Sequence, residues 1–478
     1  MFSCFAFCKD EIISVTLRKF TAANFAAVKK RIEMKFYNRE KELARLAEIR
    51  ERAFSNHSQL TVVTGRRRIG KTKLILRSCE DTPTVYLFVS RNNEASLCRM
   101  FSASIRTALD VPVPDSIQSF VDLFAQIMML GQVRKFNLVI DEFQEFYNIN
   151  SSIFSGLQDV WDRFKDISHV NFIASGSVYT LMHKIFLDYG EPLYGRCDTV
   201  IKLRPFSTSV LRAIMDDCCP GYANDDLLAL YTITGGVPKY VELLMDRQAY
   251  TVADMMRRVL EENSIFLEEG VVLLSQEFGK KYGNYFSILA AIASGRNISA
   301  EIAQAVGEAS VGGMLGRLEN DYELVSRRRP VMSKERSQNV RYEIADNFLR
   351  FWFRYVAKNQ DLVQIGQNEA LIGIALADYS TYSGLTLERW FRQKLEESGL
   401  YRSVGCWWNN SKGASVDQSE VDIVAMPVDK SKAVYVAEVK RQSKNFKPEL
   451  FKEKVKHLRD KILHGNIVEC ALLTLEDM

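Results

Sequence analysis

A glycine-rich loop that ends in lysine and threonine is the strongest chemical signal in the chain. The loop has the Walker A form, G-x-x-x-x-G-K-[ST], and it reads Gly65-Arg66-Arg67-Arg68-Ile69-Gly70-Lys71-Thr72. It follows the apolar run Leu60–Val63, as expected for a buried strand that leads through a tight loop into a helix. Backbone N–H groups of such a loop surround the β-phosphate of a nucleotide, Lys71 can reach the β- and γ-phosphates, and Thr72 can hold Mg²⁺. The loop therefore predicts binding of ATP with Mg²⁺ rather than an ordinary glycine-rich turn.

Two acids, Asp141 and Glu142, follow the apolar run 136–140 and complete a Walker B motif. Because the carboxyl ends of parallel strands face the phosphate loop, we expect Asp141 to lie near the Mg²⁺. Glu142 is expected to orient or deprotonate the water that attacks the γ-phosphate. The alternative is an acidic turn after a core strand, which the pairing with Walker A disfavours.

A third group of charged residues lies near the C-terminus. Charged and apolar residues alternate at 420–422 and 438–440, as in strands. Glu438 and Lys440 therefore point to the same face of their strand, and so do Glu420 and Asp422 in theirs. The pattern resembles the PD-(D/E)xK nuclease core, with valine at 421 instead of proline. The resemblance implies that Asp422 and Glu438 ligate Mg²⁺, that Lys440 steadies the attacking hydroxide, and that Glu388 adds a ligand from a preceding helix. A charged strand pair on a solvated sheet face is the alternative.

Basic residues follow this motif on an expected helix and suit contact with a phosphate backbone, although a solvated face explains them equally. They are Arg441, Lys444, Lys447, Lys452, Lys454 and Lys456.

The elements that position the first two motifs alternate short apolar runs with amphipathic helices. This alternation from Phe36 to about Leu203 predicts an α/β fold with a parallel sheet covered on both faces. The expected strands are Leu60–Val63, Thr84–Phe88, Phe136–Ile140, Val170–Ala174 and Thr199–Leu203. The chain then becomes helical from Ser207 to Asn263.

The middle of the chain predicts a winged helix, because three helices precede a hairpin around a basic loop. The helices are expected at 285–293, 298–306 and 310–318, and the strands at 323–325 and 341–344. The loop carries basic residues that could contact phosphates, namely Arg327, Arg328, Arg329, Lys334 and Arg336. The third helix suits base reading poorly because it contains three glycines, so protein docking or a structural role is the alternative.

Several motifs occur in the order found in bacterial and archaeal AAA+-like P-loop ATPases of the STAND class, MNS type. The segment 36–43 resembles the F-x-G-R-E-x-E-L opening of that family, with Asn38 in place of glycine. Further segments that resemble the family lie at 141–145, 173–177, 193–196, 235–240 and 346–356, the last being the D-x-F-L-R-F-W-F signature. The similarity runs from about Met34 to the C-terminus and implies a helical lid and a C-terminal nuclease-like domain of unknown function.

The resemblance also implies roles for single residues. Tyr37 and Arg39 would flank the adenine, and Ser175 would sense the γ-phosphate. Arg196 would offset transition-state charge, either in cis or for a neighbouring copy, with a surface ion pair as the alternative. Pro238 would fix the entry of a lid helix over the base, and the aromatic residues of 346–356 would be core.

The expected domains are an extension at 1–35, the P-loop core at 36–205, the helical lid at 206–270, the winged helix at 275–358 and a restriction-endonuclease-like α/β domain at 370–478. A chain of 478 residues exceeds what one core supports, in agreement with several domains. The first 33 residues are either an extension outside the fold, with Met34 as a candidate start, or a membrane-surface helix.

The composition excludes several classes. A net charge of +4 is too small to argue for nucleic acid by itself, and no apolar run is long enough to span a bilayer. Nine cysteines are scattered without a C-x-x-C pair, which disfavours a zinc site or a disulfide framework and fits a reducing cytoplasm.

Three functions remain open at this point. The first is an ATPase that uses nucleotide state to move a winged helix and a nuclease-like domain on DNA. The second is an ATP-dependent switch or scaffold, in defence or signalling, whose C-terminal domain binds without cutting. The third is a regulatory ATPase that acts on a protein partner. Assembly of the chain into a homo-oligomer is compatible with each function.

Overall fold

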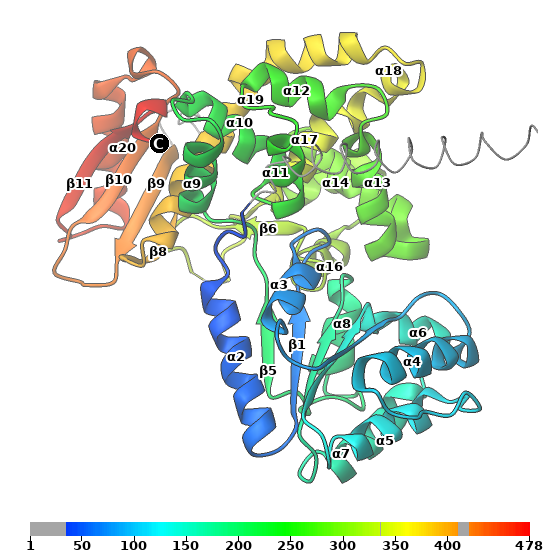
Figure 1. Cartoon of the computed structure of the whole chain (residues 1–478). Helices are drawn as coiled ribbons and strands as arrows, with labels where there is room; N and C mark the ends of the chain where they lie inside the picture. Colours follow the sequence, from blue (N-terminus) through cyan, green and yellow to red (C-terminus); the bar gives the residue numbers. More distant parts are fainter. Residues whose placement is uncertain (1–34, 335, 410–419) are drawn as a thin grey trace, which may run out of the picture.

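A computed structural model describes residues 35–334, 336–409 and 420–478. Apart from Lys35, the expected N-terminal extension lies outside these residues. Figure 1 shows the N-terminal α/β unit, the helical middle of the chain and the C-terminal sheet. All cysteines that the structure describes are free thiols. Among the described helices, none combines the length and apolar character that a membrane span needs.

The N-terminal unit is built on five parallel strands in the order β2-β3-β4-β1-β5. The five strands expected from the sequence are the ones observed, with bounds that differ by at most one residue at each end. They are β1 (Gln59–Thr64), β2 (Thr84–Phe88), β3 (Phe136–Asp141), β4 (Val170–Ser175) and β5 (Thr199–Lys202). The central strands β1, β3 and β4 are buried along their whole length, which explains their nearly continuous apolar sequence.

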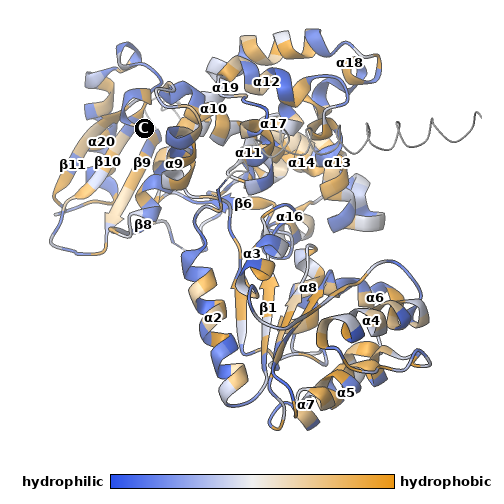
Figure 2. Ribbon diagram, in the orientation of Figure 1, coloured by the Kyte–Doolittle hydropathy of each residue, from blue (hydrophilic) through white to orange (hydrophobic). Residues whose placement is uncertain are grey.

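Helices cover both faces of this sheet, and alternate strand residues pack against each layer (Figure 2). Val63, Val139 and Ile173 face the smaller core, which α2 and α3 supply, whereas Val62, Leu138 and Phe172 face the larger one. The helices are α2 (Glu40–Ser55), α3 (Lys71–Ser78), α4 (Glu94–Leu109), α5 (Phe120–Leu130), α6 (Phe146–Ile149), α7 (Ile153–Phe164) and α8 (Tyr179–Leu187), with a 3-10 turn η1 at Phe143–Glu145.

The segment after β5 is helical, as expected. It contains α9 (Thr208–Cys218), α10 (Asn224–Thr234), α11 (Pro238–Met245), α12 (Val252–Leu260) and α13 (Ile265–Phe278), followed by the turn η2 (Gly279–Lys281). Pro238 is the first residue of α11, where its missing N–H costs no helical bond. One apolar core runs from Phe206 through these helices to residues of the C-terminal sheet.

Three helices and an antiparallel hairpin follow, in the predicted order. They are α14 (Tyr282–Ala293), α15 (Ser299–Val306), α16 (Gly312–Asn320), β6 (Val325–Arg328) and β7 (Arg341–Ile344). The first hairpin strand was expected at 323–325, but it begins at Val325. Glu323 has a φ of 51° and the N–H of Leu324 donates to the carbonyl of Leu318, so these two residues belong to the turn that ends α16.

The aromatic signature 346–356 forms α17 (Asn347–Tyr355). Its Phe348, Phe351 and Trp352 are buried, which confirms that they are core residues. The chain continues through η3 (Ala357–Asn359) and α18 (Gln360–Gln364) into α19 (Asn368–Glu397). The helix that carries Glu388 therefore begins well before Gly384, where the sequence pattern placed its opening.

The C-terminal unit is a four-stranded mixed sheet in the order β11-β10-β9-β8. Only the β10–β11 pair is parallel. The helices α19 and α20 cover opposite faces, because Ile423 and Ala437 join the core that contains α19 whereas Val424 and Val436 pack with α20. The elements are β8 (Tyr401–Trp408), β9 (Glu420–Pro427), β10 (Val434–Val439), η5 (Ser443–Asn445), α20 (Pro448–Lys461), β11 (Val468–Leu473) and η6 (Leu475–Asp477).

Candidate functional site

The phosphate loop connects β1 to the first turn of α3. Gly65 and Gly70 have φ values of 144° and 91°, which side-chain-bearing residues rarely adopt. A Cβ atom at Gly65 would also lie 2.9 Å from the carbonyl oxygen of Leu203. The N-terminal end of α3 therefore opens toward a cavity, as the Walker A pattern predicts.

The amino group of Lys71 is held inside this loop. Its Nζ donates to the carbonyls of Gly65 at 2.9 Å and Arg66 at 3.2 Å. Burial lowers the pKa of Lys71 to about 8, although the nearby charges of Glu142 and Asp141 favour the charged form. Phosphate oxygens offer stronger acceptors for this ammonium group than the two carbonyls do.

The two expected Mg²⁺ ligands contact each other. Thr72 donates from Oγ1 to Oδ2 of Asp141 at 2.7 Å, and the hydroxyl of Tyr86 donates to the same oxygen at 2.8 Å. The Thr72 hydroxyl and the Asp141 carboxylate, which come from the two Walker motifs, form a donor set that suits Mg²⁺ with several waters. Tyr86 was not singled out from the sequence, where it is one of several large residues in an edge strand.

Glu142 is fixed at the cavity by two hydrogen bonds. Its backbone is left-handed, with a φ of 54°, and its Oε2 accepts from Ser177 Oγ at 2.7 Å and from Gln144 Nε2 at 2.5 Å. Both Glu142 and Ser177 line the cavity above the phosphate loop. A carboxylate held in this way can accept a proton from a water molecule next to the phosphates.

The structure places Ser175 and Ser177 differently. Ser175 ends β4, is fully buried, and its Oγ has no hydrogen-bond partner among the described residues. Ser177 lies two residues later and reaches the cavity. Ser175 was expected at the nucleotide, but Ser177 is the serine that reaches the cavity, and the repeated Ser-Gly-Ser was the available signal for it.

A cavity of about 320 Å³ extends from the phosphate loop to the lid. Tyr37, Arg39 and Pro238 all line it, as the family resemblance implied. Arg39 is held by a 2.8 Å bond from its Nη2 to the carbonyl of Arg204, and its guanidinium lies 5.7 Å from the centre of the Phe206 ring. Further residues that line the cavity were not expected from the sequence, namely Lys35, Phe206, Lys239 and Glu242.

A partly buried carboxyl near the phosphate loop makes stability depend on pH. Burial raises the pKa of Glu277 on α13 to about 7, against 4.5 for an ordinary glutamate. The folded state therefore retains a proton that the unfolded state releases, so this residue destabilises the fold as pH rises from about 4.5 through 7. In Glu277→Gln we expect the fall in Tm between pH 5 and pH 8 to shrink by a few degrees, measured by calorimetry. Glu268→Gln, an exposed glutamate of the same helix, should keep the wild-type slope, and an unchanged slope in Glu277→Gln would contradict the assignment.

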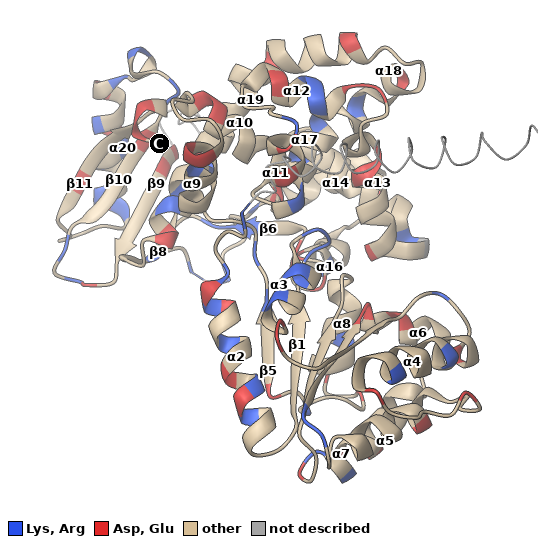
Figure 3. Ribbon diagram, in the orientation of Figure 1, with Lys and Arg blue, Asp and Glu red and all other residues tan. Residues whose placement is uncertain are grey.

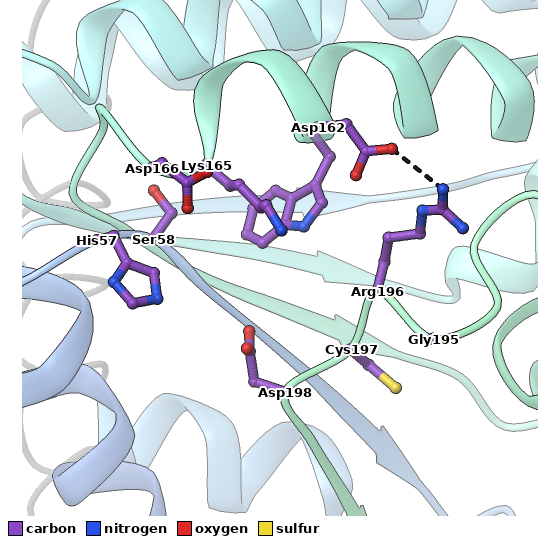
Figure 4. A pocket seen from close by; sticks show the side chains of 10 residues that line it. His57, Ser58, Asp162, Lys165, Asp166, Gly195, Arg196, Cys197 and Asp198 are labelled. Carbon is purple, nitrogen blue, oxygen red and sulfur yellow. Dashed lines mark hydrogen bonds and ion pairs between the residues drawn. The ribbon is translucent and has the colours of Figure 1, made fainter.

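Arg196 does not reach the phosphate loop. It lines a second pocket, of about 300 Å³, together with His57 and Ser58, which precede β1, whereas the phosphate loop follows β1. Figure 4 shows its guanidinium paired with Asp162, at 3.1 Å from Nη2 to Oδ2. The expected role in cis is therefore wrong and the alternative of an ion pair is correct within one chain. A role toward the nucleotide of a neighbouring copy stays a prediction.

The four residues of the nuclease-like pattern are brought together in the C-terminal unit. The Nζ of Lys440 lies 2.9 Å from Oε1 of Glu438 and 3.5 Å from Oδ2 of Asp422. Burial and the charge of Asp422 raise the pKa of Glu388 to about 7, and burial and the charge of Glu438 raise that of Asp422. Nη1 of Arg392 lies 3.4 Å from Oε2 of Glu388 and donates to the carbonyl of Asp422 at 3.3 Å, so Glu388 on α19 faces the start of β9.

Basic side chains occupy this cluster. Lys454 on α20 is 3.0 Å from Glu438 and buried with it, and Arg392 lies 3.4 Å from Glu388. Among the described residues, no group of three or more His, Cys, Asp or Glu side chains is arranged to hold a metal ion. Lys440 and Lys454 both contact the Glu438 carboxylate that the expected Mg²⁺ site would use, so a metal ion there would replace these contacts, and the site stays a prediction. The sequence pattern placed Lys454 on a basic surface, but α20 turns it inward toward Glu438.

The basic residues of the hairpin contact the protein itself. Arg327 lies 3.8 Å from Glu319, and Arg328 lies 3.3 Å from Glu343. Arg341 pairs with Glu420 of β9 at 2.9 Å and lies over the Trp408 ring at 4.4 Å. The hairpin thus packs against the C-terminal sheet through Arg341. Arg328 is partly buried against Glu343, whereas Arg327, Lys334 and Arg336 are exposed, and their contact with phosphates stays a prediction.

Two family models match the chain. Residues 36–244 match the family described as "ATPase domain predominantly from Archaea", and residues 352–454 match "Archaea bacterial proteins of unknown function". The first match covers the phosphate loop, the acidic motif and the first lid helices. The second covers most of the C-terminal carboxylate cluster.

Comparisons over most of the chain give further matches. An uncharacterized protein of Methanocaldococcus jannaschii is 27% identical over 410 residues, which are 84% of this chain and 86% of that protein. The Walker-type ATPase paby2304 of Pyrococcus abyssi superposes with a TM-score of 0.51 at 18% identity, over 67% of this chain and 96% of that one. The ORC2 protein of Aeropyrum pernix gives a TM-score of 0.42 at 14% identity, over 73% and 97%. The ATPase family match, together with the parallel sheet and phosphate loop, identifies the chain as a P-loop ATPase.

Proposed function

We propose that this protein is a Mg²⁺-dependent ATPase of the STAND class that couples its nucleotide state to contact with DNA. The observation that carries the ATPase chemistry is the convergence of Lys71, Thr72 and Glu142 on one cavity, where Thr72 also donates a hydrogen bond to Asp141. Thr72 and Asp141 would hold Mg²⁺, which when bound neutralises phosphate charge. Tyr37, Phe206 and Pro238 line the lid end of the same cavity and provide apolar surface for the base.

The residues of the chain divide the chemistry between them. Lys71 exchanges its two carbonyl partners for phosphate oxygens and offsets their charge. Glu142 orients a water molecule and accepts its proton, while Ser177 and Gln144 keep the carboxylate pointing into the cavity. Backbone N–H groups at the start of α3 contribute to charge stabilisation without reorganising.

DNA is proposed as a partner on the basis of the middle and C-terminal units. Three helices and a hairpin follow the lid in winged-helix order, and the C-terminal unit places Lys440 between Asp422 and Glu438, as in the nuclease-like pattern. Lysines and arginines also lie along α20 (Figure 3), where Lys452 and Lys456 are exposed. Phosphate contact by such residues would make DNA binding strongly dependent on salt.

A DNA cleavage assay tests the C-terminal unit. If it cuts DNA, Asp422→Asn should lower cleavage about 100-fold or more, because the variant loses a charged member of the reacting cluster. Asp429→Asn, in the exposed turn between β9 and β10, is the matched control and should cut like wild type. The assay uses several DNA forms with Mg²⁺ or Mn²⁺, each with and without ATP. Equal cleavage by Asp422→Asn and wild type would remove Asp422 from this role.

A non-cutting switch or scaffold is the second candidate, and one observation favours it. Glu438 is neutralised by both Lys440 and Lys454, which leaves it poorly suited to hold a metal ion. Wild-type protein that binds DNA without cutting it would support this candidate. Wild-type protein that hydrolyses ATP but neither binds nor cuts DNA would favour an ATPase that acts on a protein partner.

A further inference from the structure

Two arginines of the phosphate loop reach residues outside the nucleotide-binding unit. Arg66 pairs with Asp346, which precedes α17. Arg68 pairs with Glu269 of α13 at 2.7 Å, and this glutamate is 2% exposed. Both guanidinium groups lie over the ring of Tyr240, at 5.6 and 5.7 Å from its centre, and the Tyr240 hydroxyl donates to Glu269 at 2.9 Å. The loop is therefore joined to the helical units by two partly buried ion pairs.

These contacts are linked to Lys71, the residue proposed to bind the nucleotide phosphates. Lys71 donates to the backbone carbonyl of Arg66, and this bond must be given up when its ammonium group turns to a phosphate. Arg68 lines the nucleotide cavity while it pairs with Glu269. A triphosphate thus competes with Glu269 for Arg68 and releases the backbone of Arg66, so the two states of the loop differ in their contacts to the helical units.

Asp346 is linked in turn to the C-terminal cluster. One of its carboxylate oxygens, Oδ1, accepts from the N–H of Leu349 at 2.8 Å and caps α17, while Oδ2 faces Arg66. Arg389 of α19 holds the backbone just before this cap. It donates to the carbonyls of Ile344 at 2.7 Å and Ala345 at 3.2 Å, and it pairs with Glu343 at 2.8 Å.

The preceding residue of α19 is Glu388, which Arg392 joins to the start of β9, since its Nη1 lies 3.4 Å from Oε2 of Glu388 and 3.3 Å from the carbonyl oxygen of Asp422. A shift of the α17 cap therefore moves the backbone that Arg389 holds. Because Arg389 and Glu388 are neighbours on one helix, such a shift changes where the Glu388 carboxyl lies relative to β9.

We propose that the Arg66–Asp346 pair, supported by the Arg68–Glu269 pair, transmits nucleotide occupancy to the C-terminal carboxylate cluster through the α17 cap and Arg389. The inference rests on the proposed nucleotide site and adds the regulation of the C-terminal unit by it. Linkage requires the reverse effect as well, so a change at the α17 cap alters the response of the protein to nucleotide.

Hydrogen–deuterium exchange of the full chain, with and without Mg²⁺ and a non-hydrolysable ATP analogue, tests this coupling. In wild type we expect exchange to change about fivefold or more in peptides that cover 341–355 and 382–392, the size of an ordinary allosteric coupling. Asp346→Asn removes the charge but keeps a capping oxygen. It should bind the analogue with a Kd within about threefold of wild type and lose the distant exchange response.

Asp378→Asn is the matched control, because Asp378 pairs with Arg354 at the other end of α17, at 2.8 Å, and does not contact the phosphate loop. This variant should keep the distant response. Arg66→Gln should lose it, and the double variant Arg66→Gln/Asp346→Asn should behave like either single variant, since the two residues act as one pair.

The outcomes separate the coupling from the nucleotide site. Tight binding of the analogue by wild type without a change at 341–355 and 382–392 would overturn the coupling and leave the proposed ATPase intact. Equal loss of response in Asp378→Asn and Asp346→Asn would overturn the specific role of the Arg66 pair. Absence of analogue binding by wild type would overturn the coupling and the proposed function together.

Discussion

Lys71→Ala is expected to lower ATP turnover about 100- to 1,000-fold and to weaken nucleotide binding. The reason is the position of the ammonium group, which is buried inside the loop against two carbonyls and close to Glu142 and Asp141. Alanine leaves the phosphate charge without this partner at the stage where charge moves onto the leaving oxygens. Phosphate release measured at saturating ATP gives the loss in turnover, and calorimetry gives the loss in affinity.

Lys41→Ala is the control for this change, because Lys41 is an exposed lysine of α2. It should hydrolyse ATP at the wild-type rate. Wild-type turnover in Lys71→Ala would show that hydrolysis does not occur at the loop described above, whatever the fold of the domain.

Glu142→Gln is expected to separate hydrolysis from binding. Glutamine can still accept a hydrogen bond from Ser177 but it cannot take a proton, so turnover should fall about 100- to 10,000-fold. Affinity for ATP should stay near that of wild type, because Glu142 is not among the groups that hold the phosphates. Single-turnover hydrolysis and nucleotide titration of the same preparation measure the two effects.

Glu145→Gln serves as the comparison for Glu142→Gln. Glu145 lies in the same turn after β3, but its carboxylate pairs with Arg91 at 3.2 Å instead of lining the cavity. We expect a small effect on turnover. A Glu142→Gln enzyme as fast as Glu145→Gln would exclude Glu142 as the base and direct attention to another proton acceptor.

Local patterns predicted the nucleotide-binding unit well, because its signals are short-range. The apolar runs gave the strands, since a strand buried on both faces must be apolar at nearly every position. The ordered motifs then placed Lys71, Thr72, Asp141 and Glu142 at one edge of the sheet, where parallel topology brings them together.

The errors came from features that depend on distant parts of the chain. Arg196 belongs to a motif that implies a role at the nucleotide. Its position before β5 places it at the edge of the sheet opposite to the phosphate loop. Lys454 is one of many lysines in a basic segment, and only the packing of α20 turns it onto Glu438. Arg66 and Arg68 are variable positions of a loop motif, and their partners lie about 280 and 200 residues away in sequence, respectively, where no local pattern can pair them.

Titration calorimetry of the full chain with ATP and Mg²⁺ tests the central claim most directly. The arrangement of Gly65–Thr72 opposite Asp141 predicts one nucleotide per chain and a binding heat that Lys71→Ala reduces or abolishes. Heats no larger than those of dilution for both ATP and ADP, from folded wild-type protein, would contradict it.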